Sequence, residues 1–233
     1  MSSAQISCVM PVRDGERFLG EAIESALGQT RPPLEILVVI DGGTDRSAEV
    51  AMEFGPSVRL LRTPGLGPAS ARNMAIAEAR GDLIALLDCD DIWHPQKLEA
   101  QVAVIAAADS AAVCLCGVEN FWMEEVEQER LHVAETRFSS ALPGYCSSAF
   151  MASKELFERL GGFDPNRRHT DLVNWVMRAE AAGVEVTILP EVLVRRRRHS
   201  SNMSRVASQT ARDEFLELVR DKLRSARSSA GGR

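Results

Sequence analysis

The stretch "ALLDCDDIWHP", residues 85–95, places three aspartates directly after an apolar run. The length and composition of that run are typical of a buried β-strand. At this spacing the carboxylates of Asp88, Asp90 and Asp91 repel one another unless a cation or hydrogen-bond donors compensate for their charge. The stretch therefore predicts a strand that ends at a metal or basic site. The alternative is a solvated turn in which Asp91 caps a helix expected from residue 95 to 107.

Upstream of this stretch, short apolar runs alternate with segments of helical periodicity. The strands are expected at residues 6–12, 35–40, 58–61 and 83–87, and the helices at residues 18–27, after residue 45 and at residues 69–79. This order implies right-handed crossovers and a largely parallel sheet that is covered on both faces. The sequence thus predicts an α/β fold, in which ligands bind beyond the carboxyl ends of the strands.

Charged side chains follow three of these expected strands. The first strand ends in Arg13 and Asp14, the second in "IDGGTD", and the fourth in "DCDD". Within "IDGGTD", Asp41 precedes two glycines that allow a tight turn. A carboxylate there can accept a hydrogen bond from the imino group of a uracil or thymine ring, or it can serve as a turn residue. We expect the three strand ends to form one ligand-binding edge.

The second half of the chain has a less regular pattern. It predicts a strand at residues 112–118, helices at residues 154–160 and 171–182, and two short strands, "VTIL" and "VLVRR". No repeat or linker is evident, so we expect a single domain over residues 1–233. Its expected parts are a nucleotide-binding half at 1–110, an acceptor-binding and catalytic half at 111–205, and a C-terminal helix with a frayed tail at 206–233.

Composition excludes several classes of protein. A net charge of −6 argues against a dedicated nucleic-acid binder, and 45% hydrophobic residues are sufficient for a globular core. No apolar run approaches the roughly 18 to 20 residues of a transmembrane helix. The N-terminus carries no export signal, so cytoplasm is the expected compartment. The five cysteines lack CxxC spacing and are expected to be reduced and mostly buried.

The segment "GLGPASARNMAIAEARGD", residues 65–82, opens a helix after glycines and a proline. Arg72 lies within the first turns of this helix, where its guanidinium and the helix N-terminus can both face an anion such as a nucleotide phosphate. The alternative is an arginine that pairs with a neighbouring carboxylate.

Taken together, the order of these motifs resembles the family 2 inverting glycosyltransferases of the GT-A fold. The resemblance extends from "ISCVMPVRDGERFLGEAIESALGQT" to "RRRRHSSNMSR", and its centre is a DxD motif, here Asp88-Cys89-Asp90. It implies a Rossmann-like nucleotide-binding half joined to an irregular acceptor half. It also implies that Asp90 binds a divalent cation, Mg²⁺ or Mn²⁺, which bridges the two phosphates of a sugar nucleotide. Asp88 is then expected near the ribose or the cation.

The same resemblance implies a nucleoside pocket lined by Pro11, Arg13 and Asp41, with Arg72 near the base or the diphosphate. The donor would be a UDP- or dTDP-linked sugar. This chain departs from the family pattern at Arg13 and Asp14, where the family often has tyrosine and asparagine. It departs again at Ile40, where the family usually has the first acid of "DDGS".

The segment "GGFDPNRRHTDLVNWVMRAEAAG", residues 161–183, resembles the family segment that carries the general base. The family often has a Glu-Asp pair at the start of this helix, and the pair here is Thr170-Asp171. The resemblance therefore implies that Asp171 takes the proton of the acceptor hydroxyl. Asp171 can alternatively be an ordinary acid in a helical first turn, and Asp164 is a competing candidate in a predicted turn.

The run "RRRRHSSNMSR" begins at Arg195. In the resembling enzymes a histidine near this point often lies over the diphosphate or the metal, and His199 is the matching position. A neutral imidazole can ligate Mn²⁺ beside carboxylates, and the arginines can pair with phosphates or with an anionic acceptor. A strand that exposes alternate arginines to solvent is the alternative.

These observations predict a metal-dependent inverting glycosyltransferase that moves a sugar from a nucleotide-sugar donor to an acceptor hydroxyl. The acceptor class stays open among glycan, lipid-linked sugar, small molecule and peptide, and so does the oligomeric state. Two alternatives use the same carboxylates. One is a nucleotidyltransferase, which attacks phosphorus instead of carbon, and the other is a non-catalytic nucleotide-sugar binding module.

Overall fold

The structure is a computed structural model that describes residues 4–108, 111–128, 142–143, 145–203, 210, 212–218 and 220. The strands are β1 (Ile6–Val12), β2 (Glu35–Asp41), β3 (Val58–Thr63), β4 (Leu83–Leu86), β5 (Ile92–Trp93), β6 (Val113–Trp122), β7 (Leu142–Pro143), β8 (Met151–Ser153) and β9 (Val186–Arg198). The α-helices are α1 (Leu19–Leu27), α2 (Ser47–Met52), α3 (Pro68–Glu78), α4 (Lys97–Ala107), α6 (Lys154–Leu160) and α7 (Asp171–Ala181). Short 3₁₀ helices are η1 (Gly55–Ser57), η2 (Glu124–Val126) and η3 (Ser147–Ala149). Residues 212–218 are also helical, while the rest of the tail predicted at 206–233 lies almost wholly outside the described residues.

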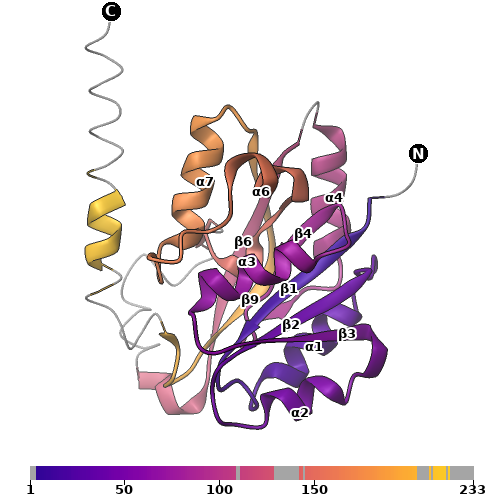
Figure 1. The fold of residues 1–233 in the computed structure, drawn as a ribbon, viewed down its shortest axis with the longest axis vertical. Helices are drawn as coiled ribbons and strands as arrows, with labels where there is room; N and C mark the ends of the chain where they lie inside the picture. Colours follow the sequence, from indigo (N-terminus) through magenta and orange to yellow (C-terminus); the bar gives the residue numbers. More distant parts are fainter. Residues whose placement is uncertain are drawn as a thin grey trace, which may run out of the picture.

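The nine strands of the described residues belong to one sheet. This sheet forms the centre of the molecule in Figure 1. Its order is β3-β2-β1-β4-β8-β6-β9-β5, with β7 paired to β6. The first four strands in this order are parallel to one another, as predicted from the alternation of strands and helices. Strand β8 then runs antiparallel to both of its neighbours, β4 and β6. The α/β fold class is confirmed, and each antiparallel pair among the described strands includes a strand of the second half.

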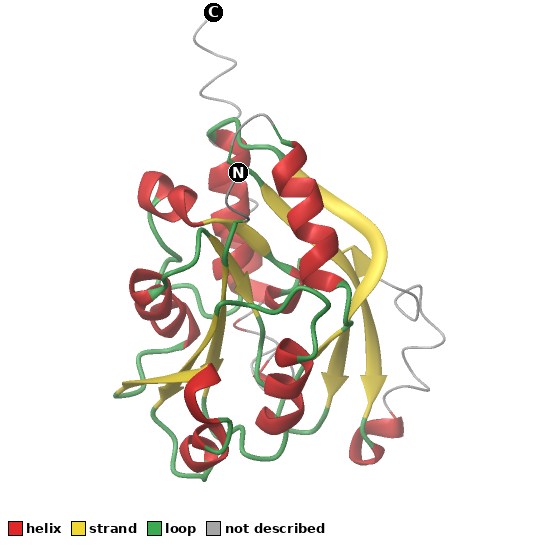
Figure 2. Ribbon diagram, turned by 90° about the vertical axis from the view of Figure 1, so that its right-hand side faces the viewer, coloured by secondary structure: helices red, strands yellow, loops and turns green. Residues whose placement is uncertain are grey.

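Helices cover both faces of the sheet, as Figure 2 shows from the side. Apolar residues of α1, α2 and α4 form one core with one face of the strands. Those of α3, α6 and α7 form a second core on the other face. Strand β2 is buried along its whole length because it is a central strand covered on both faces, which explains its nearly continuous apolar sequence.

Strand β9 differs from the prediction of two short strands. It runs unbroken through Pro190, and its register against β6 jumps from Cys116↔Leu189 to Gly117↔Val192. Proline has no N–H to give to the ladder, and the irregularity accommodates it. Gly117 is needed here, because a Cβ at this position would lie 2.8 Å from the carbonyl oxygen of Glu191. The prediction of two strands was wrong because a bulge can absorb a proline that would otherwise end a strand.

Helix α7 is held on the sheet by an aromatic cluster. The ring of Trp175 stacks on Phe157 with centroids 4.5 Å apart and meets the edge of Phe150 at 5.5 Å. The indole N–H of Trp175 also donates to the carbonyl of Gly161 at 2.8 Å. Because α7 begins at Asp171, this cluster fixes the helix that carries the predicted base.

Replacing Trp175 with alanine should lower the free energy of unfolding by about 3–5 kcal/mol, because it leaves a large cavity between α7 and α6. Urea denaturation followed by circular dichroism measures this. Met52→Ala is the control, since Met52 is 57% exposed and its loss should cost less than about 0.5 kcal/mol. A loss below about 1 kcal/mol for Trp175→Ala would contradict the packing described.

Candidate active site

The predicted acidic edge lies beyond the carboxyl end of β4. The chain turns there, with the amide of Asp91 donating to the carbonyl of Asp88 at 3.1 Å. The three aspartates are directed to different partners. Within the described residues, donors from α3, η3, β9 and the segment after β9 contact these carboxylates.

Asp91 is buried and holds three segments together. Its carboxylate accepts the hydroxyl of Ser148 at 2.6 Å and the backbone amide of Arg197 at 3.0 Å. Burial, and then the negative charges of the neighbouring aspartates Asp90 and Asp88, raise the pKa of Asp91 well above its usual range. The interpretation of Asp91 as a helix cap is wrong, because α4 begins at Lys97 and its N-cap is Gln96.

Arg72 joins two acids that lie far apart in the sequence. One of its terminal nitrogens donates to Asp171 Oδ2 at 2.6 Å, and the other donates to Asp88 Oδ1 at 2.7 Å and to Ser147 Oγ at 3.0 Å. The arginine is buried on the inner side of α3. Burial alone would lower the pKa of Arg72, but the charges of Asp171 and Asp88 outweigh it and raise that pKa.

Arg72 and Asp171 are both buried and contact each other directly. We expected Arg72 beside a diphosphate or as an arginine paired with a carboxylate, and the structure places it between two carboxylates. Asp171 is the first residue of α7 and its side chain is only 6% exposed. Asp164, the competing candidate, accepts the amide of Asn166 at 2.9 Å within the predicted turn.

Asp90 and His199, the two residues that the family resemblance implies as metal ligands, lie in contact, and their role as ligands stays a prediction. Asp90 Oδ2 lies 3.0 Å from His199 Nε2 and accepts the side-chain amide of Asn202 at 3.0 Å. The other ring nitrogen of His199 lies 2.9 Å from Ser201 Oγ, and the ring packs on Phe18 with centroids 4.7 Å apart. The imidazole is therefore held in position on both sides.

Asn202 is a site residue that the sequence analysis missed. Its side-chain oxygen accepts the backbone amide of His199 at 2.6 Å, while its nitrogen donates to Asp90 and to the carbonyl of Arg197. It closes the turn that aims the imidazole at Asp90. Asparagine three residues after a candidate ligand was a visible signal, because asparagine side chains often bond to nearby backbone in turns.

The pair formed by Asp90 and His199 fits a divalent cation. Mn²⁺ accepts carboxylate and imidazole ligands. Two adjacent ligands of an octahedral ion, each about 2.1 Å from it, lie about 3 Å apart. The observed 3.0 Å between Asp90 Oδ2 and His199 Nε2 agrees with that spacing.

A second possible ligand group lies deeper. Asp88, Asp91 and Cys146 offer atoms that lie within 4.8 Å of one another. Burial and then the charge of Asp91 raise the pKa of the Cys146 thiol to about 12. A thiol also suits Mg²⁺ or Mn²⁺ less well than carboxylate oxygens do. Both oxygens of Asp91 accept protein hydrogen bonds, whereas the contacts of Asp90 with His199 and Asn202 both involve the single oxygen Oδ2. The outer pair, Asp90 and His199, is therefore the better candidate for a metal.

Asp41 organises the loop that precedes α3. Its carboxylate accepts the hydroxyl of Thr63 and the backbone amides of Leu66 and Gly67, the latter two at 2.7 and 2.8 Å. Gly67 is the N-cap of α3 and has a φ of 92°. Asp41 is thus a loop-forming residue in the structure, and its hydrogen bond to a base stays a prediction.

Two other predicted donor-binding residues lie on or directly after β1. Pro11 is in β1, paired with Val39 of β2. Arg13 directly follows the strand and is exposed, with its Nε 4.0 Å from a carboxylate oxygen of Asp14. Arg13 therefore projects from the same edge as the acidic turn, as the pattern of strand ends predicted.

The arginine run alternates along β9. Arg195 and Arg197 both stack on Phe121, with their guanidinium carbons 4.6 and 4.7 Å from its centroid. Arg197 also donates to Glu21 at 2.6 Å, and its side chain is only 5% exposed, so the solvent-exposed interpretation is wrong for this residue. Burial alone would lower the pKa of Arg196. The negative charges of neighbouring acidic groups outweigh this effect, so the pKa of Arg196 is raised overall. Arg196 therefore lies close enough to the acidic turn to help compensate its charge.

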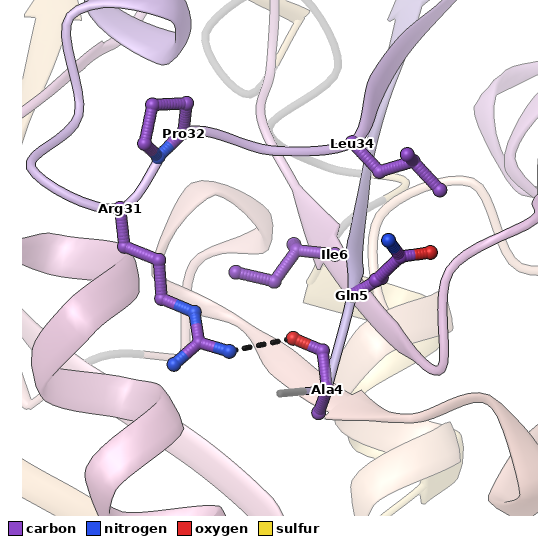
Figure 3. Close-up of a pocket in the computed structure, with 6 residues that line it drawn as sticks. All are labelled: Ala4, Gln5, Ile6, Arg31, Pro32 and Leu34. Atoms are coloured by element: carbon purple, nitrogen blue, oxygen red, sulfur yellow. Dashed lines mark hydrogen bonds between the residues drawn. The ribbon is translucent and has the colours of Figure 1, made fainter. Parts of the chain in front are cut away.

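Two hollows lie at the opposite edge of the sheet. One, of about 190 Å³, is lined by Ala4, Gln5, Ile6, Arg31, Pro32 and Leu34 (Figure 3), and there Arg31 donates to the carbonyl of Ala4 at 2.6 Å. The other, of about 580 Å³, includes Asp82 and Glu158 in its lining. Both are at the amino ends of strands, away from the acidic turn.

In the described part of the chain no helix is long and apolar enough to cross a bilayer.

Comparison with known proteins gives the same assignment as the motifs. The profile of the family described as "Glycosyl transferase family 2" matches residues 7–181. An uncharacterised glycosyltransferase of Rickettsia typhi is 28% identical over 218 residues, which cover 88% of this chain and 67% of the relative. The uncharacterised glycosyltransferase EpsJ of Bacillus subtilis is 27% identical, with 91% and 66% covered.

Two solved structures share the fold. S. aureus TarS, residues 1–349 in complex with UDP, superposes with a TM-score of 0.65 at 17% identity, over 83% of this chain and 60% of that one. The mannosyltransferase PcManGT from Pyrobaculum calidifontis, in complex with GDP-Man and Mn²⁺, also gives 0.65 at 22% identity, over 84% and 57%. This chain spans less than two thirds of either structure. From the match over residues 7–181 and this shared architecture, we conclude that the chain belongs to glycosyl transferase family 2 and has the GT-A glycosyltransferase fold.

Proposed function

We propose that this chain transfers a sugar from a UDP- or dTDP-linked donor to an acceptor hydroxyl, with inversion at the anomeric carbon and with the help of Mg²⁺ or Mn²⁺. The single observation that carries the proposal is the bridge made by Arg72. It joins Asp88 of the DxD motif to Asp171 through bonds of 2.7 and 2.6 Å. The bridge brings the candidate base and a carboxylate of the DxD motif to one side chain, so a donor bound near Asp88 and an acceptor near Asp171 would lie close together.

The residues divide the chemistry between them. Asp90 and His199 would hold the cation, which supplies positive charge to a departing diphosphate. Asp171 would accept the proton of the acceptor hydroxyl as it attacks from the face opposite the leaving group. Arg72 would orient Asp171 and balance the charge of Asp88. No covalent intermediate is required, because one base and one leaving group complete the displacement.

Three residues near the start of α3 and the end of β1 are proposed to bind the donor. Asp41, Pro11 and Arg13 would line the nucleoside pocket, and the loop that Asp41 organises lies at the start of α3. TarS binds UDP and UDP-GlcNAc, and PcManGT binds GDP-Man with Mn²⁺. We propose that residues 1–110 bind the donor and 111–205 bind the acceptor.

Product analysis tests the proposal. The chain is incubated with UDP-, dTDP- and GDP-linked sugars, with Mn²⁺ or with EDTA, and the released nucleotide is identified. We expect a nucleoside diphosphate to be released from one donor class in Mn²⁺ and not in EDTA. Formation of a nucleoside triphosphate and sugar 1-phosphate when pyrophosphate is added would indicate a nucleotidyltransferase, which runs its reaction in reverse on a nucleotide sugar. Donor binding with no release in the presence of any acceptor class or water would indicate a binding module.

A further inference from the structure

The helical residues 212–218 are attached to the segment that leads into α7 (Figure 1, yellow). The attachment is made by the carboxylate of Glu214. It accepts the backbone amides of Arg168, His169 and Thr170 at 3.3, 3.0 and 3.2 Å, and the hydroxyl of Thr170 at 3.1 Å. Four donors within three consecutive residues therefore converge on one side chain.

The residues that carry these donors immediately precede the candidate base, Asp171, in the sequence. Thr170 is the N-cap of α7 and makes no side-chain cap bond within its own helix, because its hydroxyl donates to Glu214. Asp171 is the next residue. A carboxylate at a helix N-terminus satisfies amides that lack partners within the helix and is favoured by the helix dipole. Glu214 thus anchors the N-cap residue of α7 and the two residues before it from a distant part of the chain.

The same hydrogen bonds favour the charged form of the Glu214 carboxylate. Burial would raise its pKa, but the hydrogen bonds from His169, Thr170 and Arg168 outweigh burial and lower it. The carboxylate is therefore charged at neutral pH, when its hydrogen bonds are strongest. Leu218, one turn further along the same helix, is buried. The helix thus has both a polar and an apolar attachment.

We propose that Glu214 is a positioning residue for Asp171, an inference that rests on the proposed role of Asp171 as the general base. Arg72 holds the carboxylate of Asp171 from the side of α3, and Trp175 holds α7 on the sheet. Glu214 holds the backbone that enters the helix. Without it, the amides of residues 168–170 exchange their partner for water, the first turn of α7 loosens, and Asp171 leaves its productive position.

The expected kinetic effect is selective. Glu214→Ala should lower kcat for sugar transfer about tenfold to a hundredfold, because small displacements of a catalytic group are costly. The Kd of the donor should stay within about twofold, since the residues proposed to bind it lie elsewhere. Glu214→Gln, which keeps the shape and one acceptor oxygen, should show a smaller loss of kcat. The control is Glu217→Gln on the exposed side of the same helix, which should behave as wild type.

A double-mutant cycle separates positioning from a general loss of structure. If Glu214 acts through Asp171, Glu214→Ala should lower kcat in the wild-type background and change it less than about twofold when Asp171 is already asparagine. Hydrogen exchange should quicken at residues 168–170 in Glu214→Ala and stay unchanged in the Glu217 control.

Three results would overturn the proposal. They are an equal loss of kcat in both backgrounds, a matching rise in donor Kd, and unchanged hydrogen exchange at residues 168–170. Near-normal turnover of the Asp171→Asn enzyme is a separate outcome. It would contradict the assignment of Asp171 as the general base, and with it the positioning role of Glu214.

Discussion

Asp171→Asn is expected to lower the turnover of sugar transfer by about a hundredfold to ten-thousandfold, the usual contribution of a general base. Asparagine keeps the shape of the side chain, and its oxygen can still accept from Arg72. It cannot take a proton from the acceptor hydroxyl. Donor affinity should therefore stay within about twofold, because the loss is confined to the chemical step. Steady-state kinetics and donor titration by calorimetry measure the two quantities.

Asp164→Asn is the matched control for this change. Asp164 is the other acid in the segment, and its contacts to Asn166 and to Arg167, the latter at 3.6 Å, are those of a turn. Its replacement should leave turnover near that of the wild type. If instead Asp164→Asn abolishes transfer and Asp171→Asn does not, the base lies in the turn and the bridge made by Arg72 is a structural ion pair.

Asp90→Ala is expected to remove the Mn²⁺-dependent part of donor binding. The variant loses the carboxylate oxygen that His199 and Asn202 both approach, so only the imidazole of the pair remains. In a thermal-shift titration with Mn²⁺, donor at 100 times its Kd stabilises the wild type by about 2.7 kcal/mol, and this stabilisation should disappear. The fold should persist without ligand, because Asn202 keeps its bonds to His199 and to the carbonyl of Arg197.

Glu158→Ala is the control, since Glu158 lines a hollow at the opposite edge of the sheet. It should keep the full stabilisation by donor and Mn²⁺. If Asp90→Ala retains the Mn²⁺ dependence of the wild type, the metal does not lie between Asp90 and His199. The deeper group of Asp88, Asp91 and Cys146 would then be the site to test.

Much of the fold was predictable from local pattern. Helix α6 was predicted with its observed bounds, and α3 and α7 were predicted to within one residue at each end, because apolar spacing and capping signals are local properties. The parallel order of the first strands followed from their alternation with helices. Strand β9 was mispredicted, because the tolerance of Pro190 depends on Gly117 of a strand far away in the sequence.

The candidate site was predictable in its residue types and only partly in its contacts. The pairing of Asp90 with His199 was expected from the family resemblance. The bridge from Arg72 to Asp171 joins residues 99 apart, and nothing in either segment indicates the other. Glu214 was not singled out at all, because an acid on a C-terminal helix has no distinctive pattern.

The sequence by itself determined most of the helices and the first strands, the α/β class and the acids that end the strands, because each depends on residues that are neighbours along the chain. The tertiary structure alone decided which donor meets which carboxylate. Asp88, Asp90 and Asp91 lie within four positions of one another, yet they bond to Arg72, His199 and the amide of Arg197 respectively. Those partners come from α3, β9 and the residue after β9, and the packing of α3 and the pairing of β5 with β9 bring them to the turn. Such long-range packing depends on the whole sequence, so no single motif could specify these contacts.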